Sequence, residues 1–404
     1  MLGHRNFSAL RNYNYRIYFT GMSISLIGTW AQVIALSWLV LQMTGSGTAL
    51  GLIHAAHFLP LLILGPWGGL VADRRTKHKL LLATQASSAI LSLLLGVLVV
   101  TGTVQLWMVF VITLGLGLVR VVDHPTRQAL IFEMAGKDHV QNAMVLQGTS
   151  VSVTRMLGPA IAGVLIATLG IGMCFIINAF SYIPMLVAMA LLKVDELEVA
   201  PLIEKASGQL REGFRYVMKT PVIRNNLIMM AIIGTLAYEW AVVLPLLASF
   251  TFHGEAADYA LLMTALGIGA TIGGLYTARY RSVTQPMISL AALMLGAMVV
   301  LVALAPSLLF AVVAMGLVGF FAVQFDSLNS SILQLTSSPE MRGRVMALWG
   351  VAFLGSSPIG GPLIGWICQL AGPRTGLLIG AVAAMAAATF GYVTTRRSSV
   401  ILKT

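Results

Sequence analysis

Gly69-Leu70-Val71-Ala72-Asp73-Arg74-Arg75-Thr76-Lys77-His78-Lys79 is a strongly basic segment that joins two long apolar runs, at 48–72 and 80–101. Each run is long enough to cross a bilayer as a helix. A basic turn between two such helices is typical of a loop on the cytoplasmic side of a membrane. This segment therefore predicts a pair of membrane-spanning helices and gives their direction.

The composition of the whole chain agrees with a membrane location. Hydrophobic residues make up 58% of the 404 residues, charged residues only 10%, and the mean hydropathy is +0.88. These values exclude a water-soluble globular protein, and the runs lack the alternation of β-barrel strands. We predict an all-α membrane protein with twelve transmembrane helices, near residues 17–42, 48–72, 80–101, 105–129, 142–168, 172–192, 223–250, 257–278, 286–305, 307–333, 346–371 and 375–394.

The net charge of +11 follows the predicted topology, which argues against nucleic-acid binding. Basic residues occur in alternate loops, and Arg374 is the exception in the opposite loops. The positive-inside rule then places both termini in the cytoplasm, as expected in a bacterial inner membrane. The amino terminus lacks a signal-peptide pattern, so we expect the first helix to be retained. Cys174 and Cys368 fall in different halves and are predicted to be separate packed thiols.

Weak internal repeats divide the chain into two halves. Three features recur at nearly one offset: Gly69-Leu70 and Gly274-Leu275, Asp123 and Asp326, Gly158-Pro159 and Gly361-Pro362. Such repeats predict two pseudo-symmetric six-helix bundles, at 1–192 and 222–404, joined by a cytoplasmic linker at 193–221. In the linker, one helical face is apolar and another is basic, with Leu210, Phe214 and Val217 on the first and Arg211, Arg215 and Lys219 on the second. This pattern suits an amphipathic helix on the membrane surface or a solvated tether.

These features together resemble the major facilitator superfamily, over essentially the whole chain from Arg16 to Arg397. Three shorter strings resemble the branch that holds the enterobactin exporter and the drug:proton antiporter-3 group. They are Thr44-Gly45-Ser46, Pro125-Thr126-Arg127-Gln128-Ala129 and Arg155-Met156-Leu157-Gly158-Pro159. The family pattern is broken by Thr76, His78 and Ala278.

The resemblance implies a gating latch formed by Gly69, Asp73, Arg74, Lys77 and Asp123. In it, Asp73 would lie against the amino-terminal end of the helix at 346–371, whose dipole favours an anion. Lys77 would pair with Asp123. Alternatively, Asp123 is neutralised by Arg120 and Arg127, three and four residues away on its own helix. The latch and this local pairing can coexist.

Gly158, Pro159 and Gly163 resemble the antiporter motif of exporters in the superfamily. Small residues in this pattern allow close helix contact, and the proline bends the helix. The resemblance therefore favours export over import. Ordinary small-residue packing is the alternative explanation.

Ionisable residues inside the predicted helices are the candidates for function, because a charge at a helix centre costs about 2.5 to 3.5 kcal/mol on insertion. Glu239 has no base within one helical turn, and Asp326 also has none nearby. Both are candidates for proton coupling, and a static ion pair with Arg155 is the alternative for Asp326. His54 and His57 lie three residues apart, where packing is a simpler explanation than a metal site.

The chain shows no P-loop, nucleophile elbow or kinase motif, so we predict neither an enzyme nor a bound cofactor or metal. We predict a monomeric, proton-coupled exporter of a small organic compound, such as a drug or a siderophore. The alternatives are a lysophospholipid or metal-ion transporter of the same fold, and a membrane receptor or scaffold that does not transport.

Overall fold

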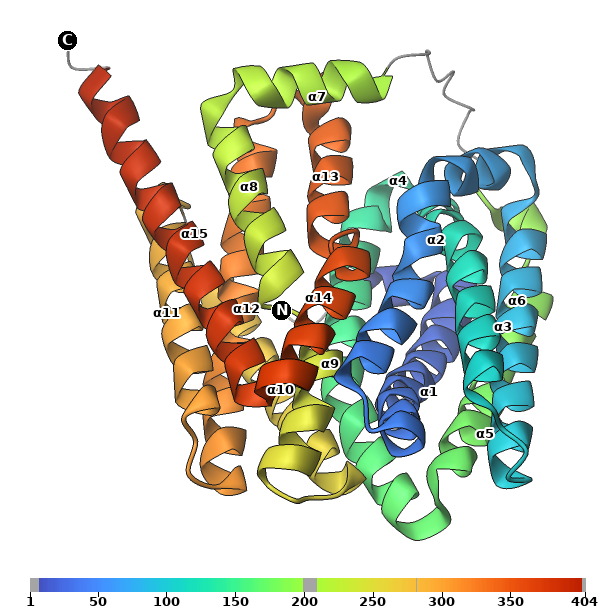
Figure 1. The fold of residues 1–404 in the computed structure, drawn as a ribbon. Helices are drawn as coiled ribbons and strands as arrows, with labels where there is room; N and C mark the ends of the chain where they lie inside the picture. The colour runs from blue at the N-terminus through green and yellow to red at the C-terminus, as the bar shows by residue number, and fades with distance from the viewer. Residues whose placement is uncertain (1–6, 199–208, 281, 402–404) are drawn as a thin grey trace. The chain divides into compact units, whose positions relative to one another are not determined.

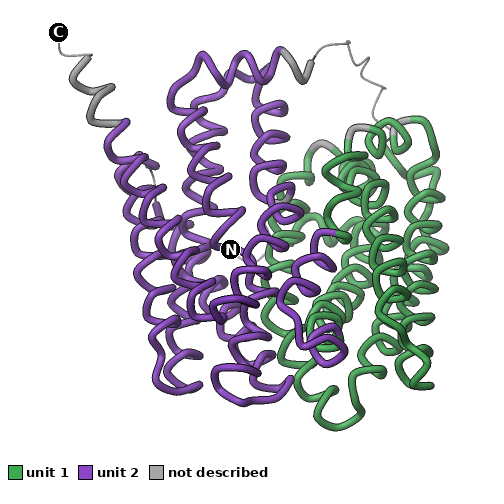
Figure 2. The backbone as a smooth tube through the Cα atoms, in the orientation of Figure 1, with its two compact units in different colours: residues 1–39, 56–203 green, residues 40–55, 204–404 purple. Residues whose placement is uncertain are grey.

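A computed structural model describes residues 7–198, 209–280 and 282–401 (Figure 1). The described residues contain twelve helical segments long and apolar enough to cross a membrane, which confirms the predicted all-α fold. They are grouped in two compact units, drawn in different colours in Figure 2. The first unit comprises residues 1–39 and 56–203, and the second comprises residues 40–55 and 204–404.

The first half of the chain runs from a short 3₁₀ turn, η1 (Ser8–Arg11), to a second one, η2 (Val194–Glu196). Between them lie α1 (Tyr13–Thr44), α2 (Gly47–Arg74), α3 (Lys77–Val100), α4 (Leu106–Leu169), α5 (Ile171–Ser181) and α6 (Ile183–Ala190). The long α4 consists of two spans that meet at Gly136, whose φ of 70° and ψ of 167° interrupt the helix. Glycine adopts this conformation without the steric penalty that a side chain would add.

The second half begins with α7 (Gln209–Lys219), which precedes the first membrane span of this half. One span is then built from α8 (Pro221–Leu236), α9 (Trp240–Leu246) and the π-helical turn η3 (Leu247–Thr251). The following spans are α10 (Ala256–Thr277), α11 (Gln285–Ala303), α12 (Leu308–Thr336), the pair α13 (Pro339–Leu354) and α14 (Ser357–Ala371), and α15 (Pro373–Ile401). The helices at 223–250 and 346–371 are therefore each broken, which the sequence analysis did not predict.

The core of the first unit is built on aromatic residues of α1. Tyr15 and Tyr18 are fully buried in a cluster with residues of α4, among them Leu130 and Met134. The Tyr15 hydroxyl donates a hydrogen bond of 2.7 Å to the carbonyl of Ala143. A buried hydroxyl needs such an acceptor, and here a backbone carbonyl supplies it.

Residues 40–55 belong to the second unit because their backbone packs directly on α14. Gly47 and Gly51 face Gly361 and Gly365, and we call these four residues the glycine seam. A Cβ atom built on Gly51 would clash with the Gly361 carbonyl and lie 2.7 Å from the Cα of Pro362. Beside the seam, the Gly47 N–H donates to Oε1 of Gln369 over 2.7 Å. Small residues are what permits two membrane helices to approach this closely.

The predicted domain boundaries at 192 and 222 stay a prediction, and residues 199–208 of the predicted linker lie outside the described residues. Cys174 and Cys368 are both buried and free, as predicted.

We expect Gly51→Ala to lower the free energy of unfolding by about 1 to 3 kcal/mol, because the added methyl group meets backbone atoms that have no room to move. Gly65→Ala on the same helix is the matched control, since a Cβ there meets nothing within 4 Å. That variant should be neutral or more stable by up to about 1 kcal/mol. Unfolding in detergent measures both, and equal stabilities would contradict the packing described for the seam.

Candidate functional site

The break between α8 and α9 directs two consecutive side chains, Tyr238 and Glu239, toward two different helices. Ala237, Tyr238 and Glu239 connect Leu236, where α8 ends, to Trp240, where α9 begins. Backbone that departs from a helix inside a membrane is tolerated where protein surrounds it. The break allows Tyr238 to reach α12 and Glu239 to reach α14.

Glu239 lies midway along its span and is buried, with 4% of its surface exposed. A Cβ built on Gly360 would lie 2.8 Å from its Oε1, and one built on Gly361 would lie 3.4 Å from its Oε2. The carboxylate thus packs against the bare backbone of α14, beside the glycine seam. Among the described residues, Oε1 of Glu239 has no hydrogen-bond partner, while the Ser357 hydroxyl interacts with the carboxylate.

Tyr238 donates a hydrogen bond of 2.8 Å from its hydroxyl to Oδ1 of Asp326 on α12. Its ring meets Phe353 edge-on, with centroids 5.9 Å apart, and Phe353 stacks on Trp349 at 5.2 Å. Asp326 is therefore tied to the broken helix through a residue that the sequence analysis did not single out. The only sequence signal for this role of Tyr238 is its position directly before the candidate acid Glu239.

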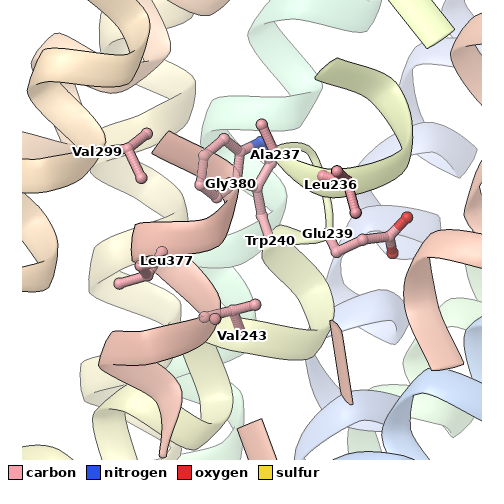
Figure 3. Close-up of a pocket in the computed structure, with 9 residues that line it drawn as sticks. Leu236, Ala237, Glu239, Trp240, Val243, Val299, Leu377 and Gly380 are labelled. Carbon is pink, nitrogen blue, oxygen red and sulfur yellow. The ribbon is translucent and has the colours of Figure 1, made fainter. Parts of the chain in front are cut away.

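A small cavity adjoins the break (Figure 3). It is lined by Leu236, Ala237, Glu239, Trp240, Val243, Val299, Gly376, Leu377 and Gly380. Figure 3 shows the Glu239 carboxylate pointing away from Leu377 and Val299. The volume of the cavity, about 10 Å³, is enough for about one water molecule. An organic substrate cannot bind there.

In the first unit, Asp123 is fully engaged by neighbours. Arg127 contacts its Oδ2 with Nη2 at 3.0 Å, as expected for the local pairing. Its Oδ1 accepts hydrogen bonds from the Thr84 hydroxyl at 2.9 Å and from Nε2 of Gln85 at 2.6 Å. Arg120 takes a different position, with Nη1 at 3.3 Å from Nε2 of His57.

Lys77 does not pair with Asp123, which corrects that part of the expected latch. Its Nζ lies 2.5 Å from Oε1 of Glu133, near the end of the first span of α4. Lys77 begins α3, whereas Asp123 lies ten residues before Glu133, roughly 15 Å deeper along the helix axis. Lys77 at the start of α3 and Glu133 near the end of the first span of α4 therefore lie at the same level, and the sequence analysis missed Glu133 as the partner. Gly69 and Arg74 lie in the last turns of α2, and the Asp73 side chain lies outside the described part of the structure.

Arg155 lies in the second span of α4, over the ring of Trp30 at 5.0 Å from its centroid. Gly158, one turn later, packs against the same tryptophan. A guanidinium over an aromatic face is stabilised by the ring's quadrupole. Arg155 belongs to the first unit and Asp326 to the second, so their predicted ion pair stays a prediction.

The two histidines of α2 have different surroundings. His57 contacts Arg120 and meets the Phe58 ring edge-on at 5.0 Å. His54 belongs to the second unit, where a Cβ built on Gly361 would lie 3.5 Å from its Cβ. Among the described residues, no group of three or more histidine, cysteine or acidic side chains is arranged to hold a metal ion.

The family model described as transmembrane secretion effector matches residues 4–399. The staphyloferrin A transporter of Staphylococcus aureus is 27% identical over 64% of this chain and 66% of its own length. The multidrug efflux pump Tap of Mycolicibacterium fortuitum is 27% identical over 85% of this chain and 87% of its own. The enterobactin exporter EntS of Shigella flexneri is 24% identical over 96% of this chain and 91% of its own.

Among solved structures, a bacterial homologue of the human lysosomal transporter Spinster has a TM-score of 0.75 at 14% identity. The match covers 96% of this chain and 97% of that one. At this identity the likeness concerns the fold alone.

A double-mutant cycle tests which acid pairs with Lys77. We expect Lys77→Ala and Glu133→Gln to show a coupling free energy of about 1.5 to 3 kcal/mol in unfolding, because a short charged hydrogen bond is lost in either single variant. Lys77→Ala with Asp123→Asn should couple by less than about 0.5 kcal/mol. Lys79→Ala, an exposed neighbour, controls for loop charge. Strong coupling of Lys77 to Asp123, without coupling to Glu133, would support the pairing of Lys77 with Asp123 that the sequence predicts.

Proposed function

We propose that this chain, which belongs to the transmembrane secretion effector family of the major facilitator superfamily, is a proton-coupled exporter of a small organic compound such as a siderophore or a drug. The relatives named for siderophores and multidrug efflux support this substrate range. The single observation that favours proton coupling is the buried Glu239 carboxylate with an oxygen lacking a partner among the described residues.

Glu239 suits a proton carrier because its surroundings do not fix its charge. A carboxylate paired with a cation holds its charge, as Asp123 does beside Arg127. The described residues provide no ion pair for Glu239, so binding and release of a proton would decide its charge. Its position beside the glycine seam means that a change of charge would act directly on the contact between residues 47–51 and α14.

The available driving force is sufficient for useful export. A membrane potential of about 100 mV supplies roughly 2.3 kcal/mol per proton, and one pH unit adds about 1.4 kcal/mol. Together these sustain a substrate gradient of roughly a few hundredfold for one proton per cycle. In this proposal both termini are cytoplasmic and the monomer is the transporting unit.

The latch belongs to the same proposal in modified form. Gly69, Asp73 and Arg74 would hold the inner side closed as the resemblance implies, with Lys77 anchored to Glu133. Gly158, Pro159 and Gly163 of α4 would provide the close helix contact of an exporter, and Gly158 packs tightly on Trp30.

We expect Glu239→Gln to abolish proton-driven, uphill export while downhill exchange continues, because the amide keeps the size of the side chain but cannot titrate. Proton uptake and substrate efflux should be measured in the same proteoliposomes at several pH values. Glu340→Gln, an exposed acid at the start of α13, is the matched control and should export normally.

Fully coupled export by Glu239→Gln would show that Glu239 does not carry the proton, and Asp326 would then be the candidate for proton coupling. Loss of affinity for cationic substrates alone, with neutral ones still coupled, would make Glu239 a binding group. Absence of any substrate-dependent proton movement in the wild-type protein, across siderophores and drugs, would favour a receptor or scaffold.

For the latch, we expect Asp73→Asn to reduce the transport rate at least severalfold without affecting membrane insertion, since the helix dipole no longer meets an anion. Transport rate and the amount of inserted protein are the two measurements. Asp138→Asn, an exposed acid at the start of the second span of α4, serves as the control. A wild-type rate in Asp73→Asn would remove Asp73 from the latch.

A further inference from the structure

The amphipathic helix α7 is attached to the second unit by one face. Figure 1 shows α7 lying across the ends of α8 and α13. Val217 is buried in a cluster with Ile223 and Val345, and the Tyr216 hydroxyl accepts a hydrogen bond of 3.2 Å from the backbone N–H of Ser338. These contacts fix the position of α7 at the start of the α8 membrane span.

An ion pair adds to this attachment. Nη1 of Arg344 on α13 lies 2.6 Å from Oε2 of Glu212, and a Cβ built on Gly213 would lie 3.1 Å from the Cβ of Arg344. The lack of a side chain at Gly213 lets the arginine stem lie against α7. A displacement of α7 would therefore be transmitted to α13.

The remaining surface of α7 carries two adjacent stripes. Phe214 and Met218 are 59% and 48% exposed, four residues apart on one side of the helix. Arg215 and Lys219, also four residues apart, are exposed next to them, and neither forms an ion pair with another described residue. Residues four apart lie one above the other on a helix, so each pair forms a continuous stripe.

A solvated tether would explain the basic stripe but not the apolar one beside it. Exposed phenylalanine and methionine beside basic residues are what a helix presents when it lies in the membrane interface. The location agrees, because only Thr220 separates α7 from α8, which begins a membrane span at Pro221. Basic residues at this level attract anionic headgroups over a short range.

We propose that α7 is a binding site for anionic phospholipid. Arg215 and Lys219 contact the phosphate groups, Phe214 and Met218 enter the acyl-chain boundary, and the bound lipid holds α7, and through Glu212 and Arg344 also α13, in place. The proposal does not depend on which compound the protein transports or on proton coupling.

The test measures lipid binding without transport. The purified full chain in neutral detergent is titrated with phosphatidylglycerol or with phosphatidylcholine, and thermal unfolding reports the apparent affinity. We expect preference for phosphatidylglycerol, and we expect Arg215→Gln and Lys219→Gln each to weaken its binding about fivefold. Arg279→Gln, an exposed base in the loop after α10, is the matched control and should bind as the wild type does. Equal affinity in wild type and the double variant Arg215→Gln/Lys219→Gln would overturn the proposal.

A second variant separates lipid from free phosphate. Phe214→Ser/Met218→Ser should also weaken phosphatidylglycerol binding, because it removes the apolar stripe and leaves the charges. Unchanged binding in that variant, together with competition by inorganic phosphate, would identify a site for phosphate alone and overturn the lipid assignment. All substituted residues are exposed, so circular dichroism and size-exclusion chromatography should match the wild type.

Discussion

The exclusion of water from the bilayer is the constraint that the structure depends on, since every charge there needs a partner or a function. The first unit meets it by pairing. Asp123 has a guanidinium, a hydroxyl and an amide around it, and Glu133 holds Lys77. Glu239 in the second unit is different, because one of its oxygens has no partner among the described residues. The contrast separates carboxylates that are engaged by basic side chains of the same unit from one that has no such partner among the described residues.

The surroundings of Glu239 show how small residues let a carboxylate pack against a helix backbone. The absence of side chains at Gly360 and Gly361 admits the Glu239 carboxylate to the surface of α14. Gly51 meets the same helix at Gly361, and Gly47 meets it one turn later at Gly365. Tyr238, the preceding residue, is bonded to Asp326 on α12. One interruption of three residues therefore links a buried acid, a second acid and a helix contact made of bare backbone.

Much of this architecture could be predicted from the sequence, because hydropathy alone determines which segments cross a membrane. Twelve spans, two separate thiols and the Asp123–Arg127 pair followed from local pattern. The pairing of Lys77 with Glu133 did not, since it depends on how far α3 and α4 extend at one end. The breaks at 237–239 and near Gly355 were also missed. Glu239 and the run Gly355-Ser356-Ser357-Pro358 interrupt the apolar pattern there, but such residues also occur inside continuous membrane helices, as Pro159 does in α4. The place of residues 40–55 in the second unit depends on glycines distant in sequence.

The position of Glu239 has a consequence for how the protein is made. Ribosomes deliver the chain from its amino terminus, so the segment Pro221–Thr251 reaches the insertion machinery before α14 has been synthesised. Its carboxyl group then enters lipid without Ser357 or the glycine backbone beside it. An 18-residue window of this segment has a mean hydropathy of 2.0, among the higher values of the twelve spans, and such apolar residues favour insertion and offset the cost of the carboxyl group. The apolar richness around Glu239 thus serves biogenesis as well as the finished bundle.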